Sequence, residues 1–270
     1  MATLNGIVRF SGQVGDLIFY RRGKKDVVRS KSAIHQLSEN SKKSGQDFGE
    51  ASRNAAYIRK AFAAMVKDYG VGDLASRLTK KINEIFRSIP NEHLGHKKLR
   101  FGNLKLLEGF EFNAVTSLTQ LLLRPPNIKL QANGLFELQL PKIDVKQLVK
   151  MIPRADGFIL QIKLFNFDLN GGDYEIIEIN DLKFDIDGVE FPGAKLRVET
   201  QQAGDRAVLI AVGISYFHDM NRKEDRRYFA CQIRNCYHLK DGVEVAFIEP
   251  VKEKALKDVE EEHGLSWELG

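Results

Sequence analysis

The sequence predicts an α+β protein: an N-terminal β-hairpin and a helical hairpin, followed by an antiparallel β-sandwich, Ig-like or barrel-like, of about seven strands. Three patterns predict this: short glycine-punctuated β-prone runs near the N-terminus, a helical stripe after them, and alternation of apolar and polar residues further on. They divide the chain into a hairpin or arm at 1–36, a helical hairpin at 37–90, the sandwich at 91–250 and a charged tail at 251–270.

The composition is that of a soluble globular protein. The chain has 270 residues, 43% apolar and 29% charged, enough for one large domain or two smaller ones. It is neither disordered nor low in complexity, and two cysteines cannot build a disulfide scaffold. No apolar run approaches the roughly 20 residues of a membrane span, and the first residues lack the profile of a signal peptide, so we expect a cytoplasmic protein.

Residues 6–31 contain three short β-prone runs, at 7–10, 17–20 and 27–28, separated by Gly12, Gly15 and the turn 22–25. These runs predict a small hairpin or meander. Such a unit is marginally stable alone, so it should pack against something else in this chain or in a neighbour.

Apolar residues then recur at helical spacing. One stripe predicts a helix that ends near Gly70: Phe48, Ala51, Ala55, Ile58, Phe62, Met65 and Tyr69. A second helix is predicted from Asp73, a suitable N-cap, to Pro90, with one apolar face: Leu74, Leu78, Ile82, Ile85 and Ile89. The heptad spacing also suits pairing with another chain, but we favour packing within the molecule.

From about Gly102 the pattern alternates as in strands with one buried face, for example over 158–164 and 181–187. The run Val208–Ile214 is apolar on both faces and predicts a central strand. Turn signals lie between the runs, at 170–172, 187–188, 204–205 and 241–242. An antiparallel sandwich or barrel follows from this spacing, since no helical pattern intervenes.

The tail carries the single tryptophan of the chain, in the segment Leu265-Ser-Trp267-Glu-Leu269. This segment either docks on its own sandwich or is an arm that reaches a neighbouring subunit, because aromatic anchors on extended segments are frequent in interfaces. Leu265, Trp267 and Leu269 are therefore candidate interface anchors.

Charge is unevenly distributed. Residues 1–100 hold 20 Lys+Arg against 9 Asp+Glu, whereas the remainder holds 21 against 27. This asymmetry can attract nucleic acid at one end or a second copy head to tail. Candidate contacts to a partner or to nucleic acid are the basic cluster and its aromatic neighbour: Tyr20, Arg21, Arg22, Lys24, Lys25, Arg29 and Lys31.

No catalytic, cofactor-binding or metal-binding residue is predicted. His93 and His96 lack a third ligand, and the segment 168–173 has a calcium-loop opening but Ile179 where the bidentate glutamate would stand, so it predicts a hairpin turn. Cys231 and Cys236 would point to opposite faces of a continuous strand and are expected to be free, buried thiols. The carboxylates of 173–190 suit a solvated sheet face or an acidic interaction patch. Common nucleotide-binding and hydrolase motifs are missing from the sequence.

Several segments resemble an uncharacterised family of bacterial proteins. They are Gly6, 12–15, 28–30, Asp47-Phe-Gly-Glu-Ala-Ser52, 58–62, 77–81, 107–113 and 152–155. Members of this family open with a glycine-punctuated hairpin and a helical pair before a β-rich half. The resemblance implies this architecture and, because the family has no established activity, no catalytic residue.

We therefore expect a non-enzymatic structural or assembly protein that self-associates through its N-terminal hairpin, its C-terminal tail or both. The alternative is a nucleic-acid-associated protein that uses the basic N-terminal region. No small-molecule ligand is identified from the sequence.

Overall fold

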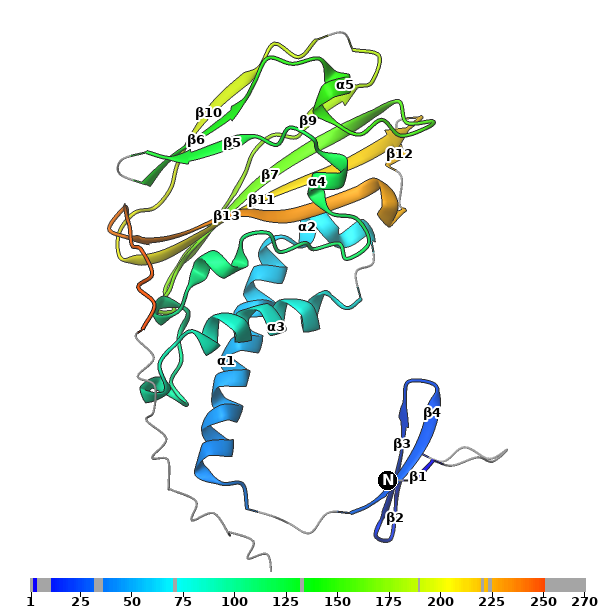
Figure 1. Cartoon of the computed structure of the whole chain (residues 1–270), viewed down its shortest axis with the longest axis vertical. Coiled ribbons are helices and arrows are strands. Elements are labelled where there is room, and N and C mark those ends of the chain that lie inside the picture. Colours follow the sequence, from blue (N-terminus) through cyan, green and yellow to red (C-terminus); the bar gives the residue numbers. More distant parts are fainter. Residues whose placement is uncertain are drawn as a thin grey trace, which may run out of the picture. The chain divides into compact units, whose positions relative to one another are not determined.

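The structure is a computed structural model and describes residues 2–3, 11–31, 36–69, 72–131, 134–188, 190–219, 221–222 and 225–250. The chain divides into two compact units, Met1–Lys42 and Lys43–Gly270, each described by itself (Figure 1). Helices and antiparallel sheets confirm an α+β protein with a β-rich C-terminal half. Among the described residues, no helix combines the length and apolarity needed to cross a membrane.

The first unit holds a four-stranded antiparallel sheet, ordered β1-β4-β3-β2. Its strands are β1 (Ala2–Thr3), β2 (Gly12–Val14), β3 (Leu17–Arg22) and β4 (Lys25–Ser30). The predicted hairpin is β3–β4, closed by Gly23 and Lys24, where Gly23 adopts the left-handed φ of 63° that glycine allows without strain. The predicted strand at 7–10 lies outside the described residues.

Helices of the second unit bury the predicted stripes except for Phe48. They are α1 (Glu39–Ala61), which begins in the first unit, α2 (Ala63–Val66), α3 (Leu74–Arg87), α4 (Leu118–Leu121) and α5 (Val145–Leu148), with short 3-10 turns at 67–69, 91–93, 99–101, 104–107 and 226–228. In Figure 1, α3 crosses α1 instead of running back beside it, so the pair is not a simple hairpin. The apolar residues predicted for the second helix are all buried: Leu74, Leu78, Ile82, Ile85 and Ile89.

Among the described residues of the second unit, ten strands form two sheets. A seven-stranded sheet is ordered β14-β13-β11-β7-β8, with β12 paired to β11 and β9 to β7, and a three-stranded sheet is ordered β10-β6-β5. The strands are β5 (Asn127–Leu130), β6 (Leu135–Leu140), β7 (Gly157–Asp168), β8 (Tyr174–Glu178), β9 (Leu182–Asp185), β10 (Ala194–Glu199), β11 (Asp205–His218), β12 (Asn221–Arg222), β13 (Phe229–Lys240) and β14 (Val243–Glu244).

The seven-stranded sheet is the middle layer of the second unit. Helices α1 to α3 cover one face and the three-stranded sheet lies over the other, as Figure 1 shows. One apolar cluster joins Phe62 and Leu78 of the helical region to Leu209 of β11, and a second joins Phe136 of β6 to Val208. Val208 to Ile214 are therefore buried on both faces, which confirms the predicted central strand. Burying each Val, Leu or Ile side chain of this strand contributes about 1.5–3 kcal/mol.

The start of the α1 stripe is predicted wrongly. Phe48 is 58% exposed, whereas the neighbouring Asp47 is 7% exposed. The Asp47 carboxylate turns inward because it accepts hydrogen bonds from the backbone N–H groups of Gly95, at 3.0 Å, and Lys97, at 3.1 Å. The helix also breaks at Phe62, although Phe62, Met65 and Tyr69 stay buried as predicted. Gly70 lies outside the described residues.

The two cysteines are free and buried as predicted, but the prediction of opposite faces is wrong. A β-bulge in β13 explains the error. Ile210 pairs with Asn235 and Ala211 with Ile233, so Arg234 is an extra residue without a partner across the ladder. One extra residue reverses the alternation beyond it, and Cys231 and Cys236 both reach the cluster under the helices.

Candidate functional sites

The predicted basic cluster is only partly brought together. Arg22 pairs with Lys25 across the β3–β4 turn, and Arg21, Arg22, Lys24 and Lys25 are all exposed at this end of the hairpin. Arg29, further along β4, lies over the ring of Tyr20 at 5.8 Å from its centroid. Lys31 lies at the other end of the hairpin, where its backbone N–H donates to Asp16.

The four-stranded sheet buries little of its own surface. Of the described residues in the first unit whose side chains are placed, only Val27 is buried, at 8% exposure. Val14 and Leu17, which pair across β2 and β3, are 65% and 44% exposed. Such a sheet lacks the packed face that an independently stable unit needs.

The predicted anchors Leu265, Trp267 and Leu269 lie outside the described residues. The described chain ends at Pro250, after β14. Their role as anchors therefore stays a prediction.

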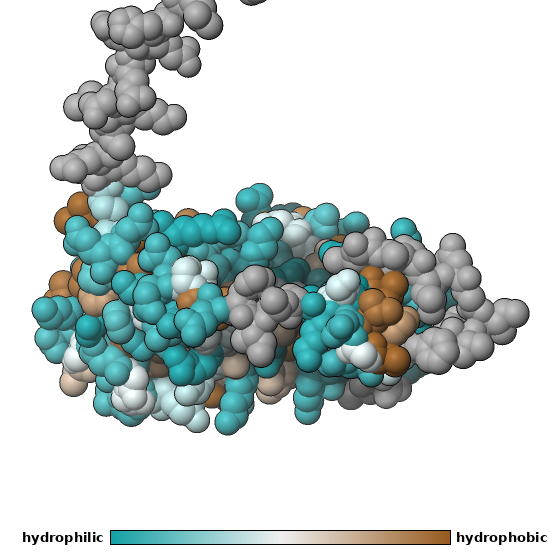
Figure 2. All heavy atoms as spheres, turned by 90° about the horizontal axis from the view of Figure 1, so that it is seen from below, coloured by the Kyte–Doolittle hydropathy of each residue, from teal (hydrophilic) through white to brown (hydrophobic). Residues whose placement is uncertain are grey.

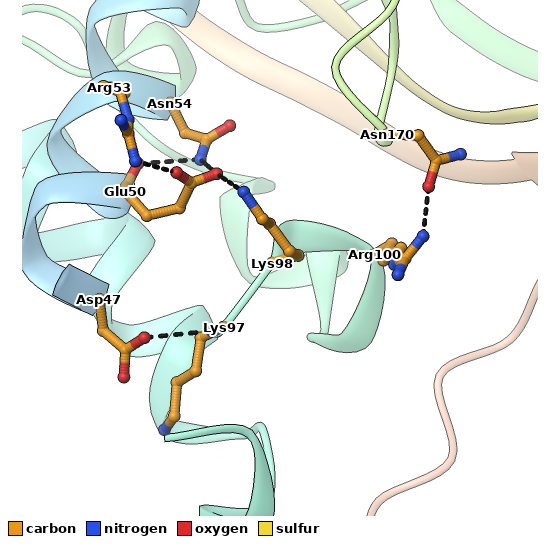
Figure 3. A network of polar contacts seen from close by, with 8 residues as sticks. All are labelled: Asp47, Glu50, Arg53, Asn54, Lys97, Lys98, Arg100 and Asn170. Carbon is orange, nitrogen blue, oxygen red and sulfur yellow. Dashed lines mark hydrogen bonds and ion pairs between the residues drawn. The ribbon is translucent and has the colours of Figure 1, made fainter. Parts of the chain in front are cut away.

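A polar network ties α1 to the segment 97–100 that follows α3 (Figure 3). Glu50 on α1 accepts hydrogen bonds from Arg53 at 2.5 Å and Lys98 at 2.8 Å. Burial alone would raise the pKa of Glu50, but the hydrogen bonds from Lys98 and Arg53 outweigh it and lower the pKa below its ordinary value. Glu50 is thus a stable carboxylate, suited to ion pairing and not to donating a proton.

The same segment is held at two other points. The Lys97 ammonium donates to the carbonyl oxygen of Phe86 at 2.7 Å and more weakly to Ile89 at 3.4 Å, next to the C-terminal end of α3. A cation there also interacts favourably with the helix dipole. Arg100 donates to the side chain of Asn170 in the β7–β8 turn, as Figure 3 shows.

These contacts border a cleft of about 320 Å³ between α1, the segment 98–100 and the β7–β8 turn. Its walls carry charges of both signs, including Glu50, Lys98 and Asp173, and two exposed aromatic rings, Tyr57 and Tyr174. Mixed charges beside aromatic rings suit the recognition of a small polar group or a polar segment of a partner.

The segment 168–173 forms the predicted hairpin turn. The Asp168 carboxylate accepts from the backbone N–H of Asn170 at 2.8 Å, and a Cβ at Gly172 would lie 2.3 Å from the same carboxylate. Its oxygens are used to shape the turn that joins β7 to β8.

His93 and the two cysteine thiols take part in packing within the fold. His93 stacks on Phe101 with ring centroids 4.5 Å apart. Burial raises the pKa of both the Cys231 and Cys236 thiols well above the usual range, which disfavours a thiolate nucleophile.

One cluster was missed in the sequence. Asp156, His218 and Asp219 place a ligand atom each within 4.8 Å of one another, and all three are exposed. The Asp156 carboxylate already contacts the His218 ring at 3.1 Å and the backbone N–H of Asp219 at 2.7 Å. No sequence spacing reveals this group, because Asp156 precedes β7 whereas His218 ends β11 and Asp219 follows it.

The surface offers no broad apolar face in the view of Figure 2. Hydrophilic residues dominate it, and hydrophobic residues form small separate areas among them.

No family model matches the chain, and no curated protein does. Among solved structures, the chain is similar to a superoxide reductase from Nanoarchaeum equitans, with 14% sequence identity and a TM-score of 0.20. The match covers 33% of this chain and 79% of that one. A TM-score this low supports no inference about fold or activity.

Proposed function

We propose that this is a non-enzymatic structural or assembly protein that self-associates through its N-terminal sheet, with the C-terminal tail as a second contact. The observation that supports the proposal is the exposure of the N-terminal sheet: Val27 is its single buried residue among those whose side chains are described. A partner surface would bury Val14 and Leu17 and give the sheet the core that it lacks.

Both edges of the N-terminal sheet are short strands, β1 and β2. Among the described residues, neither β1 nor β2 has a second strand beside it, so each leaves backbone groups free to pair with another chain. Edge pairing together with burial of the exposed apolar residues would build a contact between copies. In this proposal the two sheets of the second unit form the predicted sandwich, which carries the N-terminal sheet and the C-terminal tail as contact segments. The chain is a cytoplasmic member of the uncharacterised bacterial family.

The test is the molar mass in solution, by size-exclusion chromatography with light scattering over a range of concentrations. We expect a mass above the 30.6 kDa of one chain, and a return toward it in the double variant V14K/L17K. Both residues are exposed, so the variant should fold. The matched control V243K/I248K changes two exposed apolar residues of the second unit and should assemble as the wild type does. A wild-type protein that stays monomeric at every concentration would refute the proposal.

Nucleic-acid binding is the second candidate function. It is favoured by the gathering of Arg21, Arg22, Lys24 and Lys25 at one exposed hairpin end, a geometry that can contact successive phosphates. The measurement that separates it from self-association is the salt dependence of oligonucleotide binding.

A further inference from the structure

An apolar slot opens between the two sheets of the second unit. It has a volume of about 610 Å³ and lies between β10 of the three-stranded sheet and β8 and the start of β9 in the seven-stranded sheet. Leu138, Ile162, Ile177, Ile179 and Leu196 line it. Leu196 remains 39% exposed. The volume falls within the range of clefts that bind ligands, and the lining calls for an apolar occupant.

One wall of the slot is an open strand edge. β10 pairs with β6 along six residues, from Ala194 opposite Leu140 to Glu199 opposite Leu135. Among the described residues no strand pairs with its other side. The N–H and C=O groups along that side are therefore available to an added strand, whose alternate side chains would point into the slot.

The outer face of β10 carries two cations. Lys195 and Arg197 both contact the Glu137 carboxylate, at 2.9 and 3.8 Å, and their side chains remain 51% and 69% exposed. Each can approach a second carboxylate. An added strand with apolar residues on one face and an acidic residue on the other would match both the slot and its rim.

We infer that this slot receives residues 265–269 of a second copy of the chain, added as a strand along β10. In the sequence Leu265-Ser-Trp267-Glu-Leu269 the apolar residues alternate with polar ones, so one face of an extended strand presents Leu265, Trp267 and Leu269 and the other presents Glu268. Five extended residues span about 17 Å, close to the length of β10. The segment 251–270 has three lysines against six acidic residues, which complements the cationic rim.

The position of the chain end favours a second copy as the source. β14, after which the described chain ends, is at the edge of the seven-stranded sheet opposite to β8. The last described strand thus lies at the edge away from the slot, and six further described residues, 245–250, follow it. The fourteen residues 251–264 can span about 46 Å when extended, enough to reach a neighbouring molecule. The inference of this head-to-tail contact rests on the proposed self-association and assigns a binding site to it.

The single tryptophan makes the inference directly measurable in the full-length protein. We would record the emission of Trp267 and its quenching by acrylamide across a dilution series, with the molar mass of the same samples. Docking in a second copy predicts a blue-shifted, protected tryptophan at high concentration that becomes several-fold more quenchable on dilution. The variant L196E places a carboxylate in the slot at an exposed position and should stay quenchable at every concentration, whereas the control V243E should follow the wild type.

Four outcomes would overturn the inference. An oligomer with an exposed tryptophan removes the docking but leaves the proposed function standing, and a monomer with an exposed tryptophan removes both. A protected tryptophan that does not respond to dilution places the tail in its own molecule. An adduct seen by native mass spectrometry, with Trp267 exposed, shows that an apolar small molecule occupies the slot. As a second check, mixing the single variants L196C and W267C with a mild oxidant such as oxidised glutathione should give a disulfide-linked dimer. The native thiols should not compete, because both are buried.

Discussion

The guanidinium of Arg206 on β11 donates from Nη1 to the Asp173 carboxylate at 3.0 Å, beside the turn that joins β7 to β8. Arg206 is 1% exposed and also donates from Nε to the side-chain oxygen of Asn166 at 2.8 Å. Asn166 in turn donates to Glu175 at 2.6 Å. A fully buried cation thus orients both strands of the hairpin that borders the polar cleft.

Replacing Arg206 by Met should destabilise the fold by about 1–3 kcal/mol, because the buried Asn166 oxygen loses its donor. The hydrogen bond from Arg206 also lowers the pKa of Asp173 below its ordinary 3.8. A lowered pKa stabilises the folded state above the ordinary pKa and is lost as pH falls through the folded-state pKa. The difference in unfolding free energy between wild type and R206M, measured by urea denaturation, should therefore shrink at acidic pH. A difference that grows as pH falls would contradict this assignment.

Glu111 should show the opposite pH dependence. Burial raises its pKa above the ordinary 4.5, although its carboxylate accepts from the Leu118 N–H at 3.0 Å and from Gln232 at 2.6 Å. Its second oxygen and the Gln232 oxygen are buried without hydrogen-bond partners. Because the folded protein holds the proton more tightly, stability from this group is present below the ordinary pKa and falls as pH rises through the folded-state pKa.

The variant Glu111→Gln keeps an acceptor and removes the charge. We expect it to match or exceed the wild-type stability above the ordinary glutamate pKa and to lose the advantage below it, in denaturation curves recorded on both sides of that value. A variant that is less stable than wild type at neutral pH and equal to it in acid would show that the charged form is the stabilising one.

Asp47 should contribute more to stability than its position on a helix surface suggests. Asp47→Ala leaves the N–H groups of Gly95 and Lys97 without an acceptor, so we expect a loss of about 1–3 kcal/mol in unfolding free energy. The control is Asp73→Ala. Asp73 precedes α3, but its side chain makes no capping hydrogen bond, and its largely exposed carboxylate pairs with Arg77 at 3.0 Å, so this change should cost less than about 1 kcal/mol. Equal losses in the two variants would refute the anchoring role of Asp47.

The thiols should be inert in the native protein. Cys231 and Cys236 are both 0% exposed, and burial raises their pKa values. Ellman's reagent should therefore react with two thiols per chain in denaturant but only at the rate of unfolding in buffer. Rapid labelling of the folded protein would show that the layer of helices opens readily.

The basic turn can be tested through salt. If it binds nucleic acid, affinity should fall steeply with ionic strength, and replacing Arg21, Arg22, Lys24 and Lys25 by Ser should reduce the log–log salt slope by up to about 3.6. A matched control replaces four exposed lysines of the second unit by Ser: Lys129, Lys146, Lys150 and Lys240. Unchanged binding and slope in the hairpin variant, measured by fluorescence anisotropy with a labelled oligonucleotide, would remove this function.

The sequence by itself determined the elements whose patterns are local. The α3 stripe, the central strand Val208–Ile214 and the turn 168–173 follow from helical spacing, continuous apolarity and turn chemistry, which depend on neighbouring residues only. The exposed basic turn is likewise visible in the sequence, because two β-prone runs flank a glycine.

Only the tertiary structure decided the features that depend on distant partners. The bulge at Arg234, which places both cysteines on one face, follows from the pairing of β13 with β11. Asp47 is buried in place of Phe48 because the N–H groups of Gly95 and Lys97 lie across from it, 48 and 50 residues away. The slot beside β10 exists because two sheets pack face to face and leave one edge open. Hydrogen-bond satisfaction and strand order are properties of contacts between remote segments, and periodicity carries no information about them.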